Sequence, residues 1–214
     1  MGIKPSTSAP PAGYSRTATP AWLPAGYAKI VDDEQDPSVV QGEATNGGTC
    51  TYEKRGRLHV VRNNFDVSGC NAQQYIKDVV VTDVAIEAEL SIVKGCAGMW
   101  VRTGSRGYFL AVCHDKSLRL HKLGNDPAGE QNLLVKYTPG FDPKKVVVGL
   151  LARGTVLTVY VDGQQMKPSS SDGDIKSGRV GVGGFAPAPE NSMDATIIQF
   201  RAWAPPGSSP TPSP

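Results

Sequence analysis

Apolar and polar residues alternate along much of the chain. From residue 79 to residue 93 the even positions are mostly apolar, whereas the odd positions include Asp83, Glu87 and Glu89. A period of two is typical of a β-strand packed on one face, because a helix would scatter these residues around its axis. We therefore predict a strand whose core-facing row is Val80, Thr82, Val84, Ile86, Ala88, Leu90 and Ile92.

Several shorter stretches show the same alternation and are separated by turn residues. Asp162-Gly163 is a strong signal for a type I′ turn between two antiparallel strands. With these stretches the chain holds nine or more strands, and no segment has a convincing helical pattern. The further strands are expected at Leu118 to His121 and at residues 146–152, 155–161, 178–185 and 195–203.

A hairpin is expected around Gly104-Ser105, a pair suited to a two-residue type II′ turn. In that hairpin the numbers of paired residues sum to 209, so Cys96 lies opposite Cys113. Counting from the turn makes this a pair without mutual hydrogen bonds, with Cα atoms about 4.5 Å apart, which is within the range of a disulfide. We predict a cross-strand disulfide at this position.

The remaining cysteines, Cys50 and Cys70, would form a second bridge. Disulfides form and persist in oxidising compartments, so the pairing predicts an extracellular or cell-surface location. The alternative is four free thiols in a reducing cytosol. Trp100 and Phe109 are expected in the core, on the face that carries the disulfide and the leucines.

Composition and charge narrow the class of protein. The 214 residues are 39% hydrophobic, which is enough to fill one sizeable core. A formal net charge of +2 gives no summed field that favours nucleic acid, so we predict no nucleic-acid partner. No run of 18 apolar residues occurs, and we predict no membrane insertion by this chain.

The prolines gather at the two ends. Residues 1–27 and 205–214 are Pro/Ser-rich and are typical of extended, solvated linkers or a tail, which leaves residues 28–204 as a single folded domain. Such linkers would join the module to a larger parent polypeptide. Evenly spaced strands over this length favour an all-β fold, a two-sheet antiparallel β-sandwich of the jelly-roll type.

Five stretches of the chain also resemble a known family. They are Gly98 to Arg102, Tyr108 to Leu110, Leu157 to Gly163, Gly178 to Val182 and Asp194 to Phe200. In this order they resemble the concanavalin A-like lectin/glucanase jelly rolls, including laminin-G-like modules and bacterial 3-keto-disaccharide hydrolase-like domains. The resemblance is one of strands and turns, so it speaks for fold more than for function.

The resemblance implies a concave sheet face that binds carbohydrate or a protein. With the leucine rows in the core, the opposite face would form a polar patch with aromatic rings, and sugars bind such patches by stacking and hydrogen bonding. The alternative is an ordinary solvated sheet face with cross-strand ion pairs. The predicted ligand-binding residues are Glu87, Glu89, Tyr108, Arg119, His121 and Tyr160, with Thr158 beside them.

No cofactor is predicted, although the resemblance implies calcium at the rim in some relatives. Two oxygen-rich segments could supply ligands, Ser169 to Asp174 and Asp32 to Glu34, and neither matches an EF-hand loop. The resemblance implies that a retaining glycosidase of this fold would carry an E-x-D-x-E strand, and here Ala85 stands in place of the first carboxylate. Catalysis is therefore uncertain and we expect none.

These observations predict a non-catalytic extracellular recognition module that binds a glycan or another cell-surface ligand. The sensor domain of a bacterial receptor-type kinase is one such module. Two alternatives stay open: a glycoside hydrolase-like enzyme, with Glu87 and Glu89 as its carboxylates, and a protein-interaction or structural module.

Overall fold

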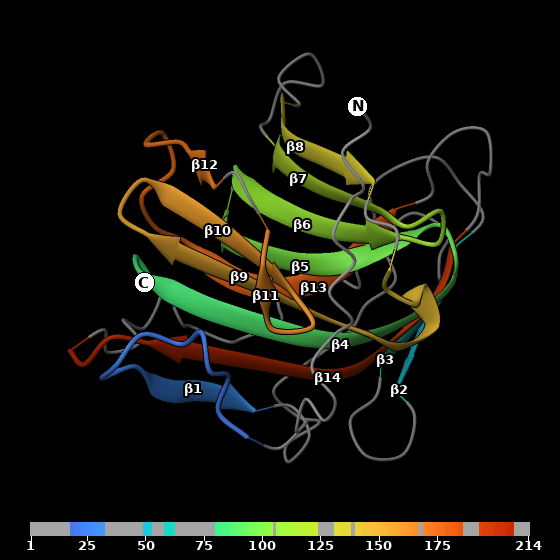
Figure 1. Cartoon of the computed structure of the whole chain (residues 1–214), viewed down its shortest axis with the longest axis horizontal. Coiled ribbons are helices and arrows are strands. Elements are labelled where there is room, and N and C mark those ends of the chain that lie inside the picture. The colour runs from blue at the N-terminus through green and yellow to red at the C-terminus, as the bar shows by residue number, and fades with distance from the viewer. Residues whose placement is uncertain are drawn as a thin grey trace, which may run out of the picture.

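The chain folds into two antiparallel β-sheets packed face to face (Figure 1). The β-sandwich predicted from the sequence is confirmed. We analysed a computed structural model, which describes residues 18–32, 49–52, 58–62, 80–104, 106–123, 131–137, 140–166, 169–185 and 193–207.

The large sheet has nine strands, seven of them in one hydrogen-bonded row. Strand β1 (Ala28–Asp32) pairs with β14, and β12 (Ser170–Ser171) pairs with β10. The row runs in the order β11 (Gln164–Gln165), β10 (Val156–Val161), β9 (Val146–Arg153), β4 (Val84–Lys94), β14 (Met193–Ala204), β3 (Leu58–Arg62) and β2 (Thr49–Tyr52).

The small sheet has five strands, four of which follow one another along the chain as neighbours (Figure 1). Among the described residues, the helical structure is a single 3-10 turn, η2 (Pro143–Lys145). The order of the small sheet is β13 (Arg179–Phe185), β5 (Cys96–Thr103), β6 (Gly107–Cys113), β7 (Ser117–Leu123) and β8 (Gln131–Tyr137).

The core lies between the sheets and follows the predicted alternation. In β4 the even row from Val84 to Ile92 is buried, and it packs with the apolar rows of β9, β10 and β14. The strand begins at Val84 rather than at residue 79, so Thr82 is exposed and Val80 is only half-buried. The small sheet contributes the inward residues of β5, β6 and β7, among them Met99, Leu110 and Leu120.

The predicted hairpin register is confirmed. Cys96 lies opposite Cys113 in the pairing of β5 with β6, and the two form a disulfide with a Cα–Cα distance of 3.9 Å. The predicted type II′ turn is wrong, because that turn needs a positive φ at Gly104 and the positive φ of 52° lies instead at Arg102. The second predicted bridge lies outside the described residues, since Cys70 and the side chain of Cys50 are not described.

The type I′ turn predicted at Asp162-Gly163 is present. The two residues have φ angles of 47° and 78°, and they connect Val161 to Gln164, which pair with each other. A type I′ turn needs positive φ at both central positions, and glycine and aspartate reach that conformation more readily than most residues.

Arg102 closes one end of the sandwich. A register shift between β5 and β13 accompanies its left-handed backbone, and its side chain is 1% exposed. Its Nε donates to the carbonyl of Thr82 at 2.7 Å, and its Nη1 donates to the carbonyls of Gly154 at 2.8 Å and Ile175 at 3.1 Å. Asp83 lies 3.5 Å from Nη2. The guanidinium therefore ties together loops that are far apart in the sequence.

Part of the predicted N-terminal tail packs on the domain. Residues 18–27 lie against the large sheet before β1 begins, and Pro20 is buried there. Residues 1–17 and 208–214 lie outside the described part of the chain. Within the described residues, no helix is long and apolar enough to cross a membrane.

Candidate functional site

The candidate site is a row of residues on the outer face of the large sheet. Tyr160 of β10 lies opposite Gly149 of β9, which lies opposite Glu87 of β4. Arg201 of β14 lies opposite Glu87 on its other side. Directly opposite residues share one face of a sheet, and the even residues of β4 occupy the core. The row therefore points away from the core, and the predicted residues Glu87 and Tyr160 are brought together in it.

A buried ion pair forms one end of this row. Arg201 donates through Nη2 to Oε1 of Glu87, and the two side chains are 3% and 2% exposed. The guanidinium carbon lies 5.3 Å from the centroid of the Trp203 ring, within the range of a cation–π contact. Removing one partner of such a pair costs about 3–5 kcal/mol, because the other charge stays buried. The pair is thus a fixed polar group flanked by an aromatic ring.

A stacked pair of aromatic rings forms the other end of the row. Trp22 lies on Tyr160 with ring centroids 4.3 Å apart and an interplanar angle of 14°. A Cβ atom at Gly149 would lie 2.5 Å from Cζ2 of Trp22, so the indole occupies space that a larger residue would fill. We call this space, over Gly149 and beside Tyr160, the stacking slot. Burial raises the pKa of the Tyr160 hydroxyl above its ordinary value.

Residues 18–27, here called the N-terminal cover, carry Trp22 into the stacking slot. Two consecutive turns shape the cover: the amide of Leu23 donates to the carbonyl of Pro20, and the amide of Tyr27 donates to that of Pro24. Gly26 supplies the positive φ, 85°, at the third position of the second turn.

One hydrogen bond joins the cover directly to the ion pair. Arg201 Nη1 donates to the carbonyl of Ala18 at 3.1 Å. The cover therefore touches both ends of the row, through Trp22 on Tyr160 and through Ala18 on Arg201.

Glu89 lies on the same outer face, two residues along β4 from Glu87. It lies opposite Gln199 of β14, and both side chains are buried. Thr158, two residues before Tyr160 in β10, is also buried. The prediction that Glu87, Glu89 and Tyr160 share a polar face therefore agrees with the strand pairing.

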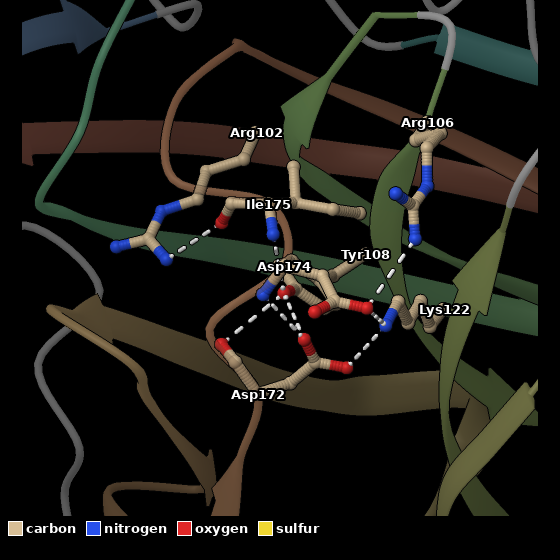
Figure 2. Close-up of polar contacts among 7 residues, drawn as sticks. All are labelled: Arg102, Arg106, Tyr108, Lys122, Asp172, Asp174 and Ile175. Carbon is tan, nitrogen blue, oxygen red and sulfur yellow. Dashed lines mark hydrogen bonds and ion pairs between the residues drawn. The ribbon is translucent and has the colours of Figure 1, made fainter.

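The prediction that Tyr108 belongs to the same face is wrong. Tyr108 points between the two sheets and is fully buried within the main core cluster. Its hydroxyl accepts a hydrogen bond from the amide of Ile175 at 3.3 Å and contacts Oδ1 of Asp172 at 3.1 Å (Figure 2). It shares a face with Leu110, because residues two apart in a strand point the same way.

Charged residues surround Tyr108 at the rim of the sandwich (Figure 2). Lys122 of β7 contacts Oδ2 of Asp172 at 2.8 Å and also binds Asp174, which in turn lies 3.6 Å from Arg106. The hydrogen bonds to Asp172 and Asp174 raise the pKa of Lys122. Burial opposes ionisation of Asp172, but bonds from Lys122, the Asp174 amide and Tyr108 outweigh it and lower its pKa.

This rim includes the predicted oxygen-rich segment Ser169 to Asp174. Its two carboxylates face the Lys122 ammonium and the Arg106 guanidinium, so cationic side chains already neutralise them. Among the described residues, no group of three or more His, Cys, Asp and Glu side chains is placed to hold a metal ion. The other oxygen-rich segment, Asp32 to Glu34, falls outside the described side chains.

Arg119 and His121 lie on the other sheet, so the predicted six-residue face does not form. Both are on the outer face of the small sheet, where His121 lies opposite Phe109. Arg119 binds the Ser117 hydroxyl at 3.1 Å and lies 3.7 Å from Asp115. Their side chains therefore cannot meet Glu87 and Tyr160 across the core.

Trp100 and Phe109 are buried, but not on the leucine face. With Cys96, Cys113 and Ala111 they form a second cluster on the outer face of the small sheet, separate from the main core. The rings of Trp100 and Phe109 lie 4.5 Å apart. The disulfide and the leucines thus occupy opposite faces of β5, β6 and β7, contrary to the prediction.

Four residues of the site escaped the sequence prediction: Arg201, Trp203, Gly149 and Trp22. The first two had a signal, because Gln199, Arg201 and Trp203 alternate with apolar residues in β14 and so mark its outer row. Trp22 was missed because its Pro-rich surroundings were assigned to a linker. An aromatic residue between two prolines was the available signal.

Solved structures with the same architecture were found for most of the chain. Carbohydrate-binding module CBM66 from Bacillus subtilis has a TM-score of 0.55 and 15% identity, covering 78% of this chain and 93% of that one. The kappa-carrageenase from Pseudoalteromonas carrageenovora, in complex with an oligotetrasaccharide of kappa-carrageenan, has a TM-score of 0.53 and 14% identity, covering 87% and 98%. The chain has a concanavalin A-like jelly-roll fold.

A third jelly roll is a Bacillus subtilis protein of unknown function with a galectin-like fold. Its TM-score is 0.55 at 11% identity, with 84% of this chain and 99% of that one covered. No protein-family model matches the jelly-roll chain, and no curated protein matches it in sequence. At these identities the likeness concerns the fold, and the residues of the site must be judged from their own chemistry.

Proposed function

We propose that this protein is a carbohydrate-binding module that holds a glycan on the outer face of its large sheet. Tyr160 would stack on a sugar ring, and the Glu87–Arg201 pair would bind its hydroxyl groups. The observation that carries the proposal is the stacking slot, where Tyr160 and Gly149 already accept a flat ring of about the right size from Trp22.

The chemistry of the row suits a sugar. Pyranose rings have apolar faces that pack on aromatic rings, and their hydroxyl groups both donate and accept hydrogen bonds. A carboxylate accepts such bonds and a guanidinium donates them in a fixed fork geometry. Glu87 and Arg201 supply both groups next to the slot, and Trp203 adds a second ring beyond them.

The structural neighbours support this class of ligand. One of them is described as a carbohydrate-binding module, and another was solved with a carrageenan oligosaccharide bound. This chain spans nearly the whole of both proteins, so the likeness extends over the complete sandwich.

We place the module outside the cell or at the cell surface, as part of a larger parent polypeptide. The Cys96–Cys113 disulfide supports this location, because structural disulfides persist in oxidising compartments. The Pro/Ser-rich ends would serve as spacers to the rest of the parent. The sensor part of a bacterial receptor-type kinase is one parent that such a module would suit.

The arrangement of carboxylates favours binding over hydrolysis. A retaining glycosidase needs two carboxyl groups about 5–5.5 Å apart, one of them free to attack the sugar. Glu87 instead bonds to Arg201, and Ala85 occupies the place of a further carboxylate in the strand. A hydrolase would still reveal itself in the test below by turning over the bound glycan.

The test is a glycan array followed by titration calorimetry on the tightest hit. We expect Tyr160→Ala to weaken binding at least tenfold, because the stacking surface is lost. Arg119→Ala is the matched control on the small sheet, and we expect unchanged affinity. The proposal is contradicted if no glycan binds, or if Arg119→Ala abolishes binding while Tyr160→Ala has no effect. In the first case a protein partner becomes the better hypothesis.

A further inference from the structure

We propose that the N-terminal cover is an internal competitor for the glycan site, with Trp22 occupying the place of a sugar ring on Tyr160. This inference rests on the proposed function, and it adds a form of regulation to it. The glycan and the cover would exclude each other from this site, so that glycan binding displaces residues 18–27 from the outer face of the large sheet.

Exclusion follows from the dimensions of the stacking slot. The indole of Trp22 lies nearly parallel to the Tyr160 ring at 4.3 Å, which is the distance of direct stacking. The atoms of Gly149 close the slot from below, since even a single Cβ there would come within 2.5 Å of the indole. A sugar ring and Trp22 cannot lie on the same face of Tyr160 together.

The cover also engages the polar end of the row. Its Ala18 carbonyl accepts a hydrogen bond from Nη1 of Arg201, a donor that a sugar hydroxyl would otherwise use. The cover thus presents both kinds of contact expected of a glycan, a flat ring on the tyrosine and an acceptor on the arginine. Two independent contacts reproduced by one segment support the view that it mimics the ligand.

The way in which the cover is built allows it to leave without unfolding the domain. The described hydrogen bonds of Leu23 to Pro20 and of Tyr27 to Pro24 lie within the cover, so they can stay formed when it lifts. The chain then enters β1, which pairs with β14 from Ala28 onward and anchors the displaced segment. Ala25 and Gly26 are exposed and stand next to this anchor, where a hinge would be needed.

The free energy needed to displace the cover determines how much the cover weakens glycan binding. When a site is open for only a fraction of the time, the apparent dissociation constant rises by the inverse of that fraction. A cover that leaves the slot open about one-tenth of the time would weaken glycan binding about tenfold, which corresponds to about 1.4 kcal/mol. Removal of the Trp22 ring should therefore strengthen glycan binding by the same factor of about ten.

The experiment compares full-length wild type with Trp22→Ala by titration calorimetry, using xylohexaose, cellohexaose and a kappa-carrageenan oligosaccharide as probes. We expect the variant to bind the preferred probe about tenfold more tightly. Arg119→Ala, a change on the outer face of the small sheet and away from the cover, is the control and should leave the affinity as it is in wild type.

Amide hydrogen exchange of the wild-type protein, with and without the probe, is a second measurement. It requires no variant and therefore does not depend on whether a variant folds. With the probe bound, exchange should rise at those amides of residues 18–27 that packing on the sheet protects, while the Leu23 and Tyr27 amides keep their turn bonds and exchange in β1 stays unchanged. Equal affinities for wild type and Trp22→Ala, with no change in exchange, would overturn the competitor while leaving the glycan site intact if Tyr160→Ala still weakens binding. Weaker binding by Trp22→Ala would also overturn it, because Trp22 would then be part of the binding surface. Failure of every variant to bind any probe would remove the proposed function and the competitor together.

Discussion

At the scale of single residues, the alternation of side chains predicted one half of the site and misplaced the other. Glu87 and Tyr160 were assigned correctly to one face because β4 and β10 have a clear apolar row and a clear polar row. Strands β5 and β6 are buried on both faces, since the second cluster around the disulfide covers the outer side. Alternation alone could not tell inside from outside there, and Tyr108 was placed on the wrong face.

Lys122 provides a test of the rim through its dependence on pH. Its folded pKa is raised, so its contribution to stability is present below the unfolded pKa of about 10.4 and is lost as pH rises through the folded value. The folded pKa of Asp172 is lowered, so its contribution is present above about pH 3.9 and is lost as pH falls through the folded value.

We therefore expect Lys122→Met to reduce the free energy of unfolding by about 1 kcal/mol between pH 5 and pH 9. The difference from wild type should shrink below about pH 3.9, as the pH falls through the lowered folded pKa values of Asp172 and Asp174 and the carboxylates become protonated. Urea denaturation at a series of pH values measures this. A deficit that stays constant from pH 9 down to the lowest pH at which the protein is folded would mean that packing, and not the charge network, accounts for the loss.

At the scale of elements, the hairpin of β5 and β6 was predicted to the residue. Turn position fixed its register, and the register placed Cys96 opposite Cys113. The predicted turn type was wrong, because the left-handed backbone conformation occurs at Arg102 and not at Gly104. The Arg102 side chain lies inside the fold, where it donates hydrogen bonds to the carbonyls of Thr82, Gly154 and Ile175. Those partners are distant in the sequence, so turn chemistry alone could not reveal them.

The disulfide of this hairpin should contribute measurably to stability. It closes a loop with a sequence separation of 17, for which chain entropy gives about 3 kcal/mol. We expect the double variant Cys96→Ala/Cys113→Ala to lose about that much in guanidinium denaturation while keeping the β-sheet circular dichroism of the wild type. An unchanged free energy of unfolding would contradict the chain-entropy argument, in which the bridge stabilises the fold by restricting the unfolded chain.

At the scale of the whole molecule, the fold was predictable and the composition of the site was not. A β-sandwich follows from the spacing of strands and turns, whereas the site is assembled from β4, β9, β10, β14 and the cover before β1. Contacts between Trp22 and Tyr160 or between Arg201 and Ala18 join positions 138 and 183 residues apart. A pattern read along the chain carries no information about which distant strands become neighbours.

The three tryptophans report separately on the two outer faces of the sandwich. Trp22 and Trp203 lie at the outer face of the large sheet, with Trp22 of the cover in the stacking slot and Trp203 of β14 beside Arg201, whereas Trp100 lies on the small sheet near the disulfide. Their indole N–H resonances can be followed individually in one ¹⁵N-labelled sample. Trp100 therefore serves as an internal control.

The most direct test of the glycan site is a titration of this sample with the preferred oligosaccharide, monitored by the indole resonances. We predict that the Trp22 and Trp203 signals move as the sugar binds while the Trp100 signal stays in place. Movement of Trp100 with no change at Trp22 and Trp203 would place the glycan on the small sheet and contradict the site at Tyr160, Glu87 and Arg201.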